Sequence, residues 1–141
     1  MRVIFYTNSH TRSRLLAESM RIGLRPHGLQ LTTLSASAYR QPVEDVAVFY
    51  GLAGNLKKVM QDYTRAGMRA IFFDRGYWGR HEGGRYRGYH RVCVNSFHAT
   101  PHLQNRVHPT DRAAKFNLPS CLENTRRKEH IVLAGQSAKA A

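Results

Sequence analysis

The stretch that decides the fold is VAVFYGLAGNLKKVMQDYTRAGMRAIFFD, residues 46–74. Residues 46–52 form a nearly continuous apolar run, as central strands of parallel sheets do. Gly67 is expected to end a helix that precedes a second apolar strand over residues 68–74. The apolar face of that helix repeats at helical spacing through Leu56, Val59, Met60 and Tyr63. The stretch therefore predicts a strand, a helix and a strand, the repeating unit of α/β proteins.

The N-terminal part predicts the same alternation. Residues 2–7 are β-branched and aromatic and predict a strand, and residues 29–37 predict another. Between them we expect a helix that ends at Pro26 and Gly28. Its apolar face is predicted to hold Leu15, Leu16, Met20 and Leu24, with the charged side chains elsewhere, namely Arg12, Arg14, Glu18, Arg21 and Arg25.

Two further strands are expected over residues 90–97 and 131–135, and residues 99–129 predict loop and short helix. Alternating strands and helices imply right-handed crossovers, so the predicted class is α/β, with an open, mostly parallel sheet and helices on both faces. The chain has 141 residues, which suits one domain. We expect that domain over residues 1–130, followed by a terminal strand and tail over residues 131–141 that could begin a second half.

The charge of the chain points to a polyanionic partner. Lysine and arginine number 22 against 9 acidic residues, which gives a net charge of +13. A field of this sign attracts nucleic acids, nucleotides and other polyanions, although charge alone carries no sequence specificity. Nucleic acid is the expected partner, and a host protein or nucleoprotein complex is the alternative.

The sequence gives no indication of a membrane or an oxidising compartment. No apolar run approaches the length that spans a bilayer, and the N-terminal one is too short for a signal peptide. Cys93 and Cys121 lie far apart and match no disulfide framework, and Cys93 is expected to be a buried thiol. We therefore expect a cytoplasmic protein without a membrane partner. Pro101 separates His98 from His102, which argues against a zinc site on one helical face.

The segment FDRGYWGRHEGGRYRGYHR, residues 73–91, combines cations, rings and glycines, and we call it the basic aromatic segment. Its arginines are candidates for phosphate contacts: Arg75, Arg80, Arg85, Arg87 and Arg91. Its rings are candidates for stacking on bases or sugars: Tyr77, Trp78, Tyr86 and Tyr89. Alternatively, some of these rings belong to the core, or the segment is a solvated connection.

Ligands of open parallel sheets collect at the carboxyl ends of the strands. Four stretches follow predicted strands and are expected to meet at one edge: TNSHT, YGLAGN, DRGYWGR and NSFHAT, residues 7–11, 50–55, 74–80 and 95–100. In the second stretch Gly51, Gly54 and Asn55 precede a helix and could form an anion-binding turn, or simply a tight turn.

Histidines after two strands are the candidates for acid and base chemistry. His10 and His98 each follow a strand, and either could act as a general base toward a hydroxyl group. Asp74 could orient such a histidine or bind a sugar hydroxyl, or it could cap its own loop.

Four short motifs carry a resemblance to a known family. They are FYGLAGN, GYWGR, GYHR and VNSFHAT, residues 49–55, 76–80, 88–91 and 94–100. With these motifs the chain resembles phage and prophage glycosyltransferases of the two-Rossmann-domain type, over nearly its whole length. The resemblance implies a Rossmann-like domain and the cytoplasm of an infected bacterium.

Members of that family are longer, and HIVLAG-type text begins their second half, whereas this chain ends at Ala141. In such enzymes the second half usually holds the sugar nucleotide and the first half the acceptor. The resemblance thus implies an acceptor-side domain that lacks the donor site. No cofactor is expected to bind tightly, and a sugar nucleotide is expected only if the protein is catalytic.

Two classes of function follow from these observations. The first is a glycosyltransferase-like domain that binds a polyanionic acceptor, nucleic acid above all, with His10 or His98 as base and Asp74 as its orienting partner. The second is a bacteriophage protein without turnover that binds nucleic acid through the basic aromatic segment, or inhibits a host protein or nucleoprotein complex.

Overall fold

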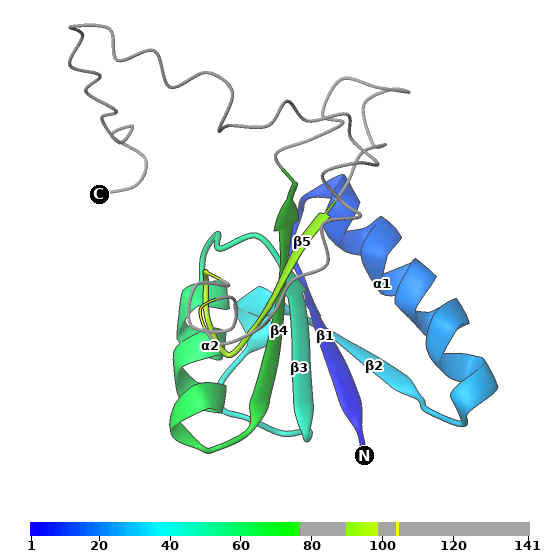
Figure 1. Ribbon diagram of the computed structural model, residues 1–141, viewed down its shortest axis with the longest axis horizontal. Coiled ribbons are helices and arrows are strands. Elements are labelled where there is room, and N and C mark those ends of the chain that lie inside the picture. The colour runs from blue at the N-terminus through cyan, green and yellow to red at the C-terminus, as the bar shows by residue number, and fades with distance from the viewer. Residues whose placement is uncertain (77–89, 99–103, 105–141) are drawn as a thin grey trace, which may run out of the picture. The chain divides into compact units, whose positions relative to one another are not determined.

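The computed structural model describes residues 1–76, 90–98 and 104, which fall within one compact unit, Met1–Arg106. Within the described residues the strands form a single five-stranded sheet (Figure 1). In chain order the elements are β1 (Val3–Thr7), α1 (Thr11–Leu24), the 3₁₀ turn Arg25–His27, β2 (Leu31–Ser35), the 3₁₀ turn Ala36–Ala38, β3 (Val46–Tyr50), α2 (Leu56–Arg65), β4 (Arg69–Arg75) and β5 (His90–Val94).

The sheet is open and mostly parallel, as the sequence predicts. Its strand order is β2-β1-β3-β4-β5, in which the first four strands are parallel and β5 runs antiparallel to β4. This is a Rossmann-like α/β arrangement. The strand expected over residues 131–135 lies outside the described residues, and so does the loop expected over residues 99–129, apart from Gln104.

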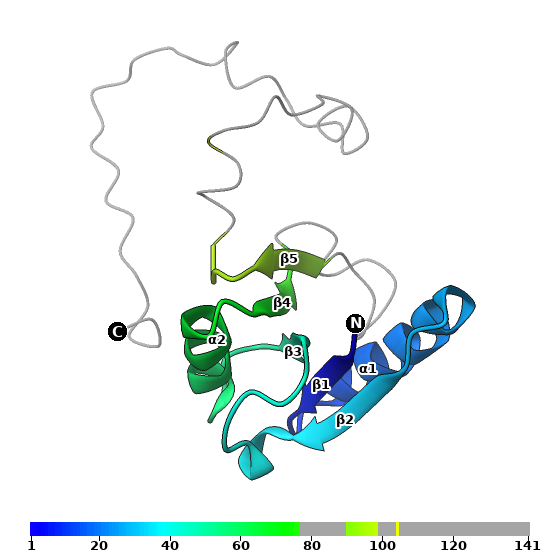
Figure 2. The same ribbon diagram turned by 90° about the horizontal axis from the view of Figure 1, so that it is seen from below.

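Alternate residues of β1 belong to two separate core clusters. Ile4 and Tyr6 pack in one cluster with the predicted apolar face of α2, which is fully buried: Leu56, Val59, Met60 and Tyr63. Val3 and Phe5 pack in the other cluster, which contains Ala17 of α1. Successive side chains of a strand point to opposite faces, which is why one strand serves both clusters. Figure 2 shows α1 and α2 from a second direction.

The buried face of α1 differs from the predicted one. Leu15 is 49% exposed, whereas Arg12 and Ser13 are buried. The helix faces the sheet through Ser13 and Ala17, with three of the expected side chains packed beside them, Leu16, Met20 and Leu24. Small side chains allow close approach to the sheet, and this turns the helix so that Leu15 faces away from the core. Arg12 consequently lies on the buried side, where the apolar pattern did not place it.

Because β5 is antiparallel, its two ends lie at unexpected edges of the sheet. His90, its first residue, pairs with Arg75 at the carboxyl edge of the parallel strands, and Val94 pairs with Ile71. After the strand, Asn95 exchanges hydrogen bonds with the backbone of Ala70, near the start of β4. The expectation that residues 95–100 join the other three stretches is therefore wrong.

Two further features complete the described part. Cys93 is a buried free thiol, as expected, and burial raises its pKa. In the described ranges, no helix combines the length and the apolar composition needed to cross a bilayer.

Candidate anion-binding site

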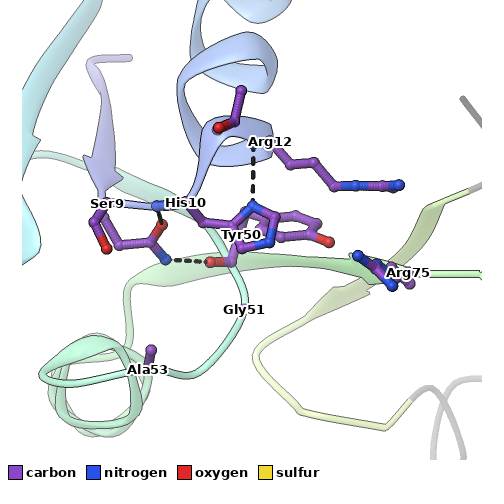
Figure 3. Close-up of a pocket in the computed structure, with 9 residues that line it drawn as sticks. Ser9, His10, Arg12, Tyr50, Gly51, Ala53 and Arg75 are labelled. Carbon is purple, nitrogen blue, oxygen red and sulfur yellow. Dashed lines mark hydrogen bonds between the residues drawn. The ribbon is translucent and has the colours of Figure 1, made fainter. Parts of the chain in front are cut away.

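Three of the four predicted stretches meet at the carboxyl edge of the sheet. The stretches after β1 and β3 and the end of β4 enclose a pocket of about 450 Å³ (Figure 3). It is lined by Asn8, Ser9, His10, Thr11, Arg12, Tyr50, Gly51, Ala53 and Arg75. In the order β2-β1-β3, the chain leaves β1 toward one side and returns on its other side, so the pocket lies at the switch point where open α/β sheets bind ligands.

Asn8 fixes the turn that forms one wall of the pocket. Its side-chain oxygen accepts the backbone N–H of His10 over 2.9 Å, and its amide donates to the carbonyl of Tyr50 over 2.9 Å. The backbone N–H of Asn8 donates to the hydroxyl of Ser13. These bonds tie the turn to β3 and to the first turn of α1, so Asn8 shapes the pocket and its amide groups are already engaged.

His10 is the N-cap of α1, a role usually taken by serine, threonine or aspartate. Its Nδ1 accepts the backbone N–H of Arg12 over 3.1 Å. A backbone N–H can only donate, so Nδ1 is the unprotonated nitrogen and Nε2 of the neutral ring carries the proton. His10 thus offers a hydrogen-bond donor at Nε2. In this state neither nitrogen is free to act as the predicted general base.

The aromatic ring of Tyr50 lies between two histidines. Its centroid is 5.4 Å from that of His10 and 6.0 Å from that of His90. Tyr50 is 5% exposed, so it fixes the positions of both imidazole rings and offers little surface for stacking on a ligand.

Two arginines make the pocket electropositive. Arg12 is 7% exposed and Arg75 is exposed at the end of β4. Figure 3 shows both side chains on the same side of the His10 ring. No carboxylate is among the described residues that line the pocket, and within residues 1–76 and 90–98 Arg75 makes no ion pair. The start of α1 adds the positive end of a helix dipole.

His90 is a site residue that the sequence reasoning did not identify. Burial lowers its pKa, the charge of Arg12 lowers it further, and Asp74 partly opposes both. No group in the described ranges forms a hydrogen bond with its Nε2. Its position was missed because only the ends of predicted strands were considered, whereas the first residue of an antiparallel strand shares the carboxyl edge of its parallel neighbours.

Asp74 and Arg91 form an ion pair of 3.0 Å. Asp74 also accepts the backbone N–H of Arg75, so it caps its own loop, which is the alternative that the sequence left open. The pair lies on the other side of the sheet from Arg75 and His90, because neighbouring residues of a strand point to opposite faces. In the described ranges no hydrogen bond joins Asp74 to His10 or His98.

The predicted anion-binding turn after β3 is only partly in the pocket. Gly51 and Ala53 line it, but the N–H of Gly51 donates to the carbonyl of Phe73 over 2.9 Å. Gly51 and Gly54 both have positive φ angles, 74° and 61°, which glycine adopts without strain. Asn55 makes no side-chain cap to α2, and its amide donates to the carbonyl of Ala36. The glycines therefore shape a tight turn.

The remaining candidates lie elsewhere. His98 is in the bend after β5, toward the amino edge, where its N–H and carbonyl both bond to the hydroxyl of Ser96. The other candidates of the basic aromatic segment lie outside the described residues: Tyr77, Trp78, Arg80, Arg85, Tyr86, Arg87 and Tyr89. In the described part of the chain no three His, Cys, Asp or Glu side chains are grouped as a metal site requires.

Comparison with known proteins adds no relative. No family model matches the chain, and no curated protein matches its sequence. The resemblance to phage and prophage glycosyltransferases therefore stays a prediction, and the argument for function depends on the site itself.

Proposed function

We propose that this protein binds nucleic acid through a cationic surface at the carboxyl edge of its sheet. The observation that carries the proposal is the convergence of Arg12, Arg75 and the Nε2–H of His10 around one pocket. These groups come from different elements, and the fold brings them to the edge where open α/β sheets bind ligands.

The basic aromatic segment is anchored at the same edge. Its flanking residues Arg75 and His90 pair with each other in the sheet, so residues 76–89 leave it and return to it beside the pocket. Three arginines, a tryptophan and three tyrosines lie within those residues. We infer that they extend the cationic surface and stack on bases or sugars. The inference takes the sheet to be Rossmann-like with one helix against each face, which the two core clusters support.

Salt dependence of binding tests the proposal directly. A labelled single strand of DNA or RNA with hydroxyl ends is titrated with the protein at rising salt, and the fluorescence anisotropy is followed. Counterion release predicts that log K falls with log salt, with a slope of about −0.7 per neutralised phosphate for a single strand. A flat dependence, or no binding at low salt, would contradict the proposal.

A matched pair of variants locates the binding surface. Arg75 and Arg69 are exposed arginines of the same strand, but they lie at opposite edges of the sheet. Arg75→Ala is expected to weaken binding and to reduce the salt slope by about 1, as expected for one lost phosphate contact. Arg69→Ala is the control and is expected to keep both values. Equal effects of the two variants would indicate diffuse attraction by net charge instead of a surface at the carboxyl edge.

The glycosyltransferase-like function is the second candidate, and the size of the pocket favours it. A volume of about 450 Å³ at a switch point suits a nucleotide-sized ligand. Two measurements test this candidate: the mass of nucleic acid after incubation with the protein and sugar nucleotides, and the thermal stabilisation of the protein by a uridine nucleotide. A gain in mass would establish transfer, whereas unchanged mass together with salt-dependent binding would leave binding alone as the function.

A further inference from the structure

We propose that the pocket between the β1–α1 turn and the end of β4 is a subsite for a terminal phosphate group, carried by a nucleotide at a strand end. The inference rests on the proposed function and deepens it, because it separates one compact site from the extended cationic surface. The groups that would hold the phosphate are the Nε2–H of His10 and the guanidinium groups of Arg12 and Arg75.

The donors match the geometry of a phosphate. Guanidinium groups present planar pairs of N–H donors that fit phosphate oxygens, and hydrogen bonds between charged groups are the strong ones. His10 adds a donor whose orientation is fixed, because its Nδ1 is held by the N–H of Arg12. None of the described lining residues is acidic, so no carboxylate competes with the ligand in this part of the chain.

The amount of positive charge favours a phosphate monoester over an internal diester. A diester carries a single negative charge, whereas a monoester carries about −1.5 to −2 at neutral pH. Two guanidinium groups and the positive end of α1 face the pocket, so a monoester neutralises them more completely. The effect of Arg12 on the pKa of His90 is an independent sign that this side of the pocket is electropositive.

The size of the pocket indicates that more than the phosphate enters. About 450 Å³ exceeds what an inorganic phosphate needs and lies in the range of pockets that hold small organic ligands. A phosphate attached to a nucleoside meets both requirements. Such a group comes either from the end of a nucleic acid strand, which we propose, or from a free mononucleotide.

Oligonucleotide ends provide the test. Three single strands of one sequence are compared by anisotropy at fixed salt, one with a 5′-phosphate, one with a 3′-phosphate and one with hydroxyl ends. One phosphorylated strand is expected to bind about tenfold more tightly than the hydroxyl-ended strand, the gain of roughly one charge-assisted hydrogen bond. Equal affinities for all three strands would overturn the proposal.

The variants Arg75→Ala and Arg69→Ala show whether the preference arises in the pocket. Arg75 is exposed, so its replacement spares the core, and it is expected to remove most of the preference. Arg69→Ala is expected to keep it. A preference that survives in both variants would overturn the assignment to this pocket.

A mononucleotide titration separates the two sources of the phosphate and the two proposals. A nucleoside 5′-monophosphate that binds more weakly than the phosphorylated strand supports the strand end, whereas one that binds more tightly than any strand overturns it in favour of the free nucleotide. Salt-dependent binding of the hydroxyl-ended strand without a preference for phosphate refutes the subsite alone. Binding of the mononucleotide without binding of any strand refutes nucleic-acid binding, and with it the strand end.

Discussion

The backbone N–H of Arg12 donates to Nδ1 of His10 over 3.1 Å, and this bond gives the histidine two tasks. It caps the first turn of α1, and it leaves the protonated Nε2 as the group available to a ligand. A residue predicted as a base is thereby better suited to donate a hydrogen bond to an anion.

Two substitutions of His10 separate these tasks. Asparagine is a good N-cap, so His10→Asn is expected to retain the free energy of unfolding and to weaken the binding of the phosphorylated strand. His10→Ala removes cap and donor together, and the lost cap is expected to cost about 1 kcal/mol of stability. Urea unfolding and anisotropy measure the two quantities. Unchanged phosphate binding in His10→Asn would remove His10 from the ligand site.

The sequence predicted the sheet because its strands and α2 have strong local patterns. Leu56, Val59, Met60 and Tyr63 repeat at helical spacing and are all buried, so hydrophobic burial alone fixes that face. The face of α1 was less predictable, because its central contacts come from Ser13 and Ala17, which carry little hydrophobic signal. Close approach to the sheet decides that face, and a pattern of large apolar residues does not reveal it.

The site was predictable only in part, for a topological reason. The carboxyl ends of parallel strands meet at one edge, which correctly placed His10, Gly51 and Arg75 together. Strand direction is not visible in the pattern of residues 90–97, since parallel and antiparallel strands can both be apolar runs. The antiparallel pairing of β5 brings His90 to the pocket edge and takes His98 away from it.

His90 is expected to make stability depend on pH. Its pKa is lowered by burial and by the charge of Arg12, so the unfolded chain binds the proton more tightly than the folded one. The stability contributed by the neutral ring is complete above the ordinary pKa of about 6.5 and is lost as the pH falls through that value toward the lower folded pKa. The groups around the ring are Arg12 of α1, Tyr50 of β3, and Asp74 and Arg75 of β4.

Urea unfolding on both sides of that range measures the effect. Between about pH 7.5 and 5.5 the wild-type protein is expected to lose more stability than His90→Gln, which has no proton to gain. His98→Gln serves as the control, because His98 lies away from this cluster, and it is expected to follow the wild type. Parallel curves for the wild type and His90→Gln would show that the charge of His90 is not destabilising.

The hydroxyl of Tyr63 is expected to contribute measurably to stability. It lies 3.1 Å from the hydroxyl of Tyr6 and accepts the backbone N–H of Val43 over 3.3 Å. Both tyrosines are fully buried, so Tyr63→Phe leaves polar partners without their bond at an expected cost of about 1–3 kcal/mol. Urea unfolding measures it, with Tyr39→Phe as a comparison because that hydroxyl donates to the more accessible Asp62. A loss below that of Tyr39→Phe would contradict the importance of the Tyr6 and Tyr63 pair.

The basic aromatic segment is tested by a change of three charges. The triple variant Arg80→Ala, Arg85→Ala and Arg87→Ala is expected to bind nucleic acid more weakly and with a salt slope reduced by up to about 3, since each lost phosphate contact removes about 1. The matched control changes three exposed arginines near the amino edge, Arg25, Arg65 and Arg69, and so carries the same net charge. If net charge alone attracted the ligand, both variants would lose affinity equally. A loss confined to the first variant, with unchanged urea unfolding, would assign binding to residues 76–89.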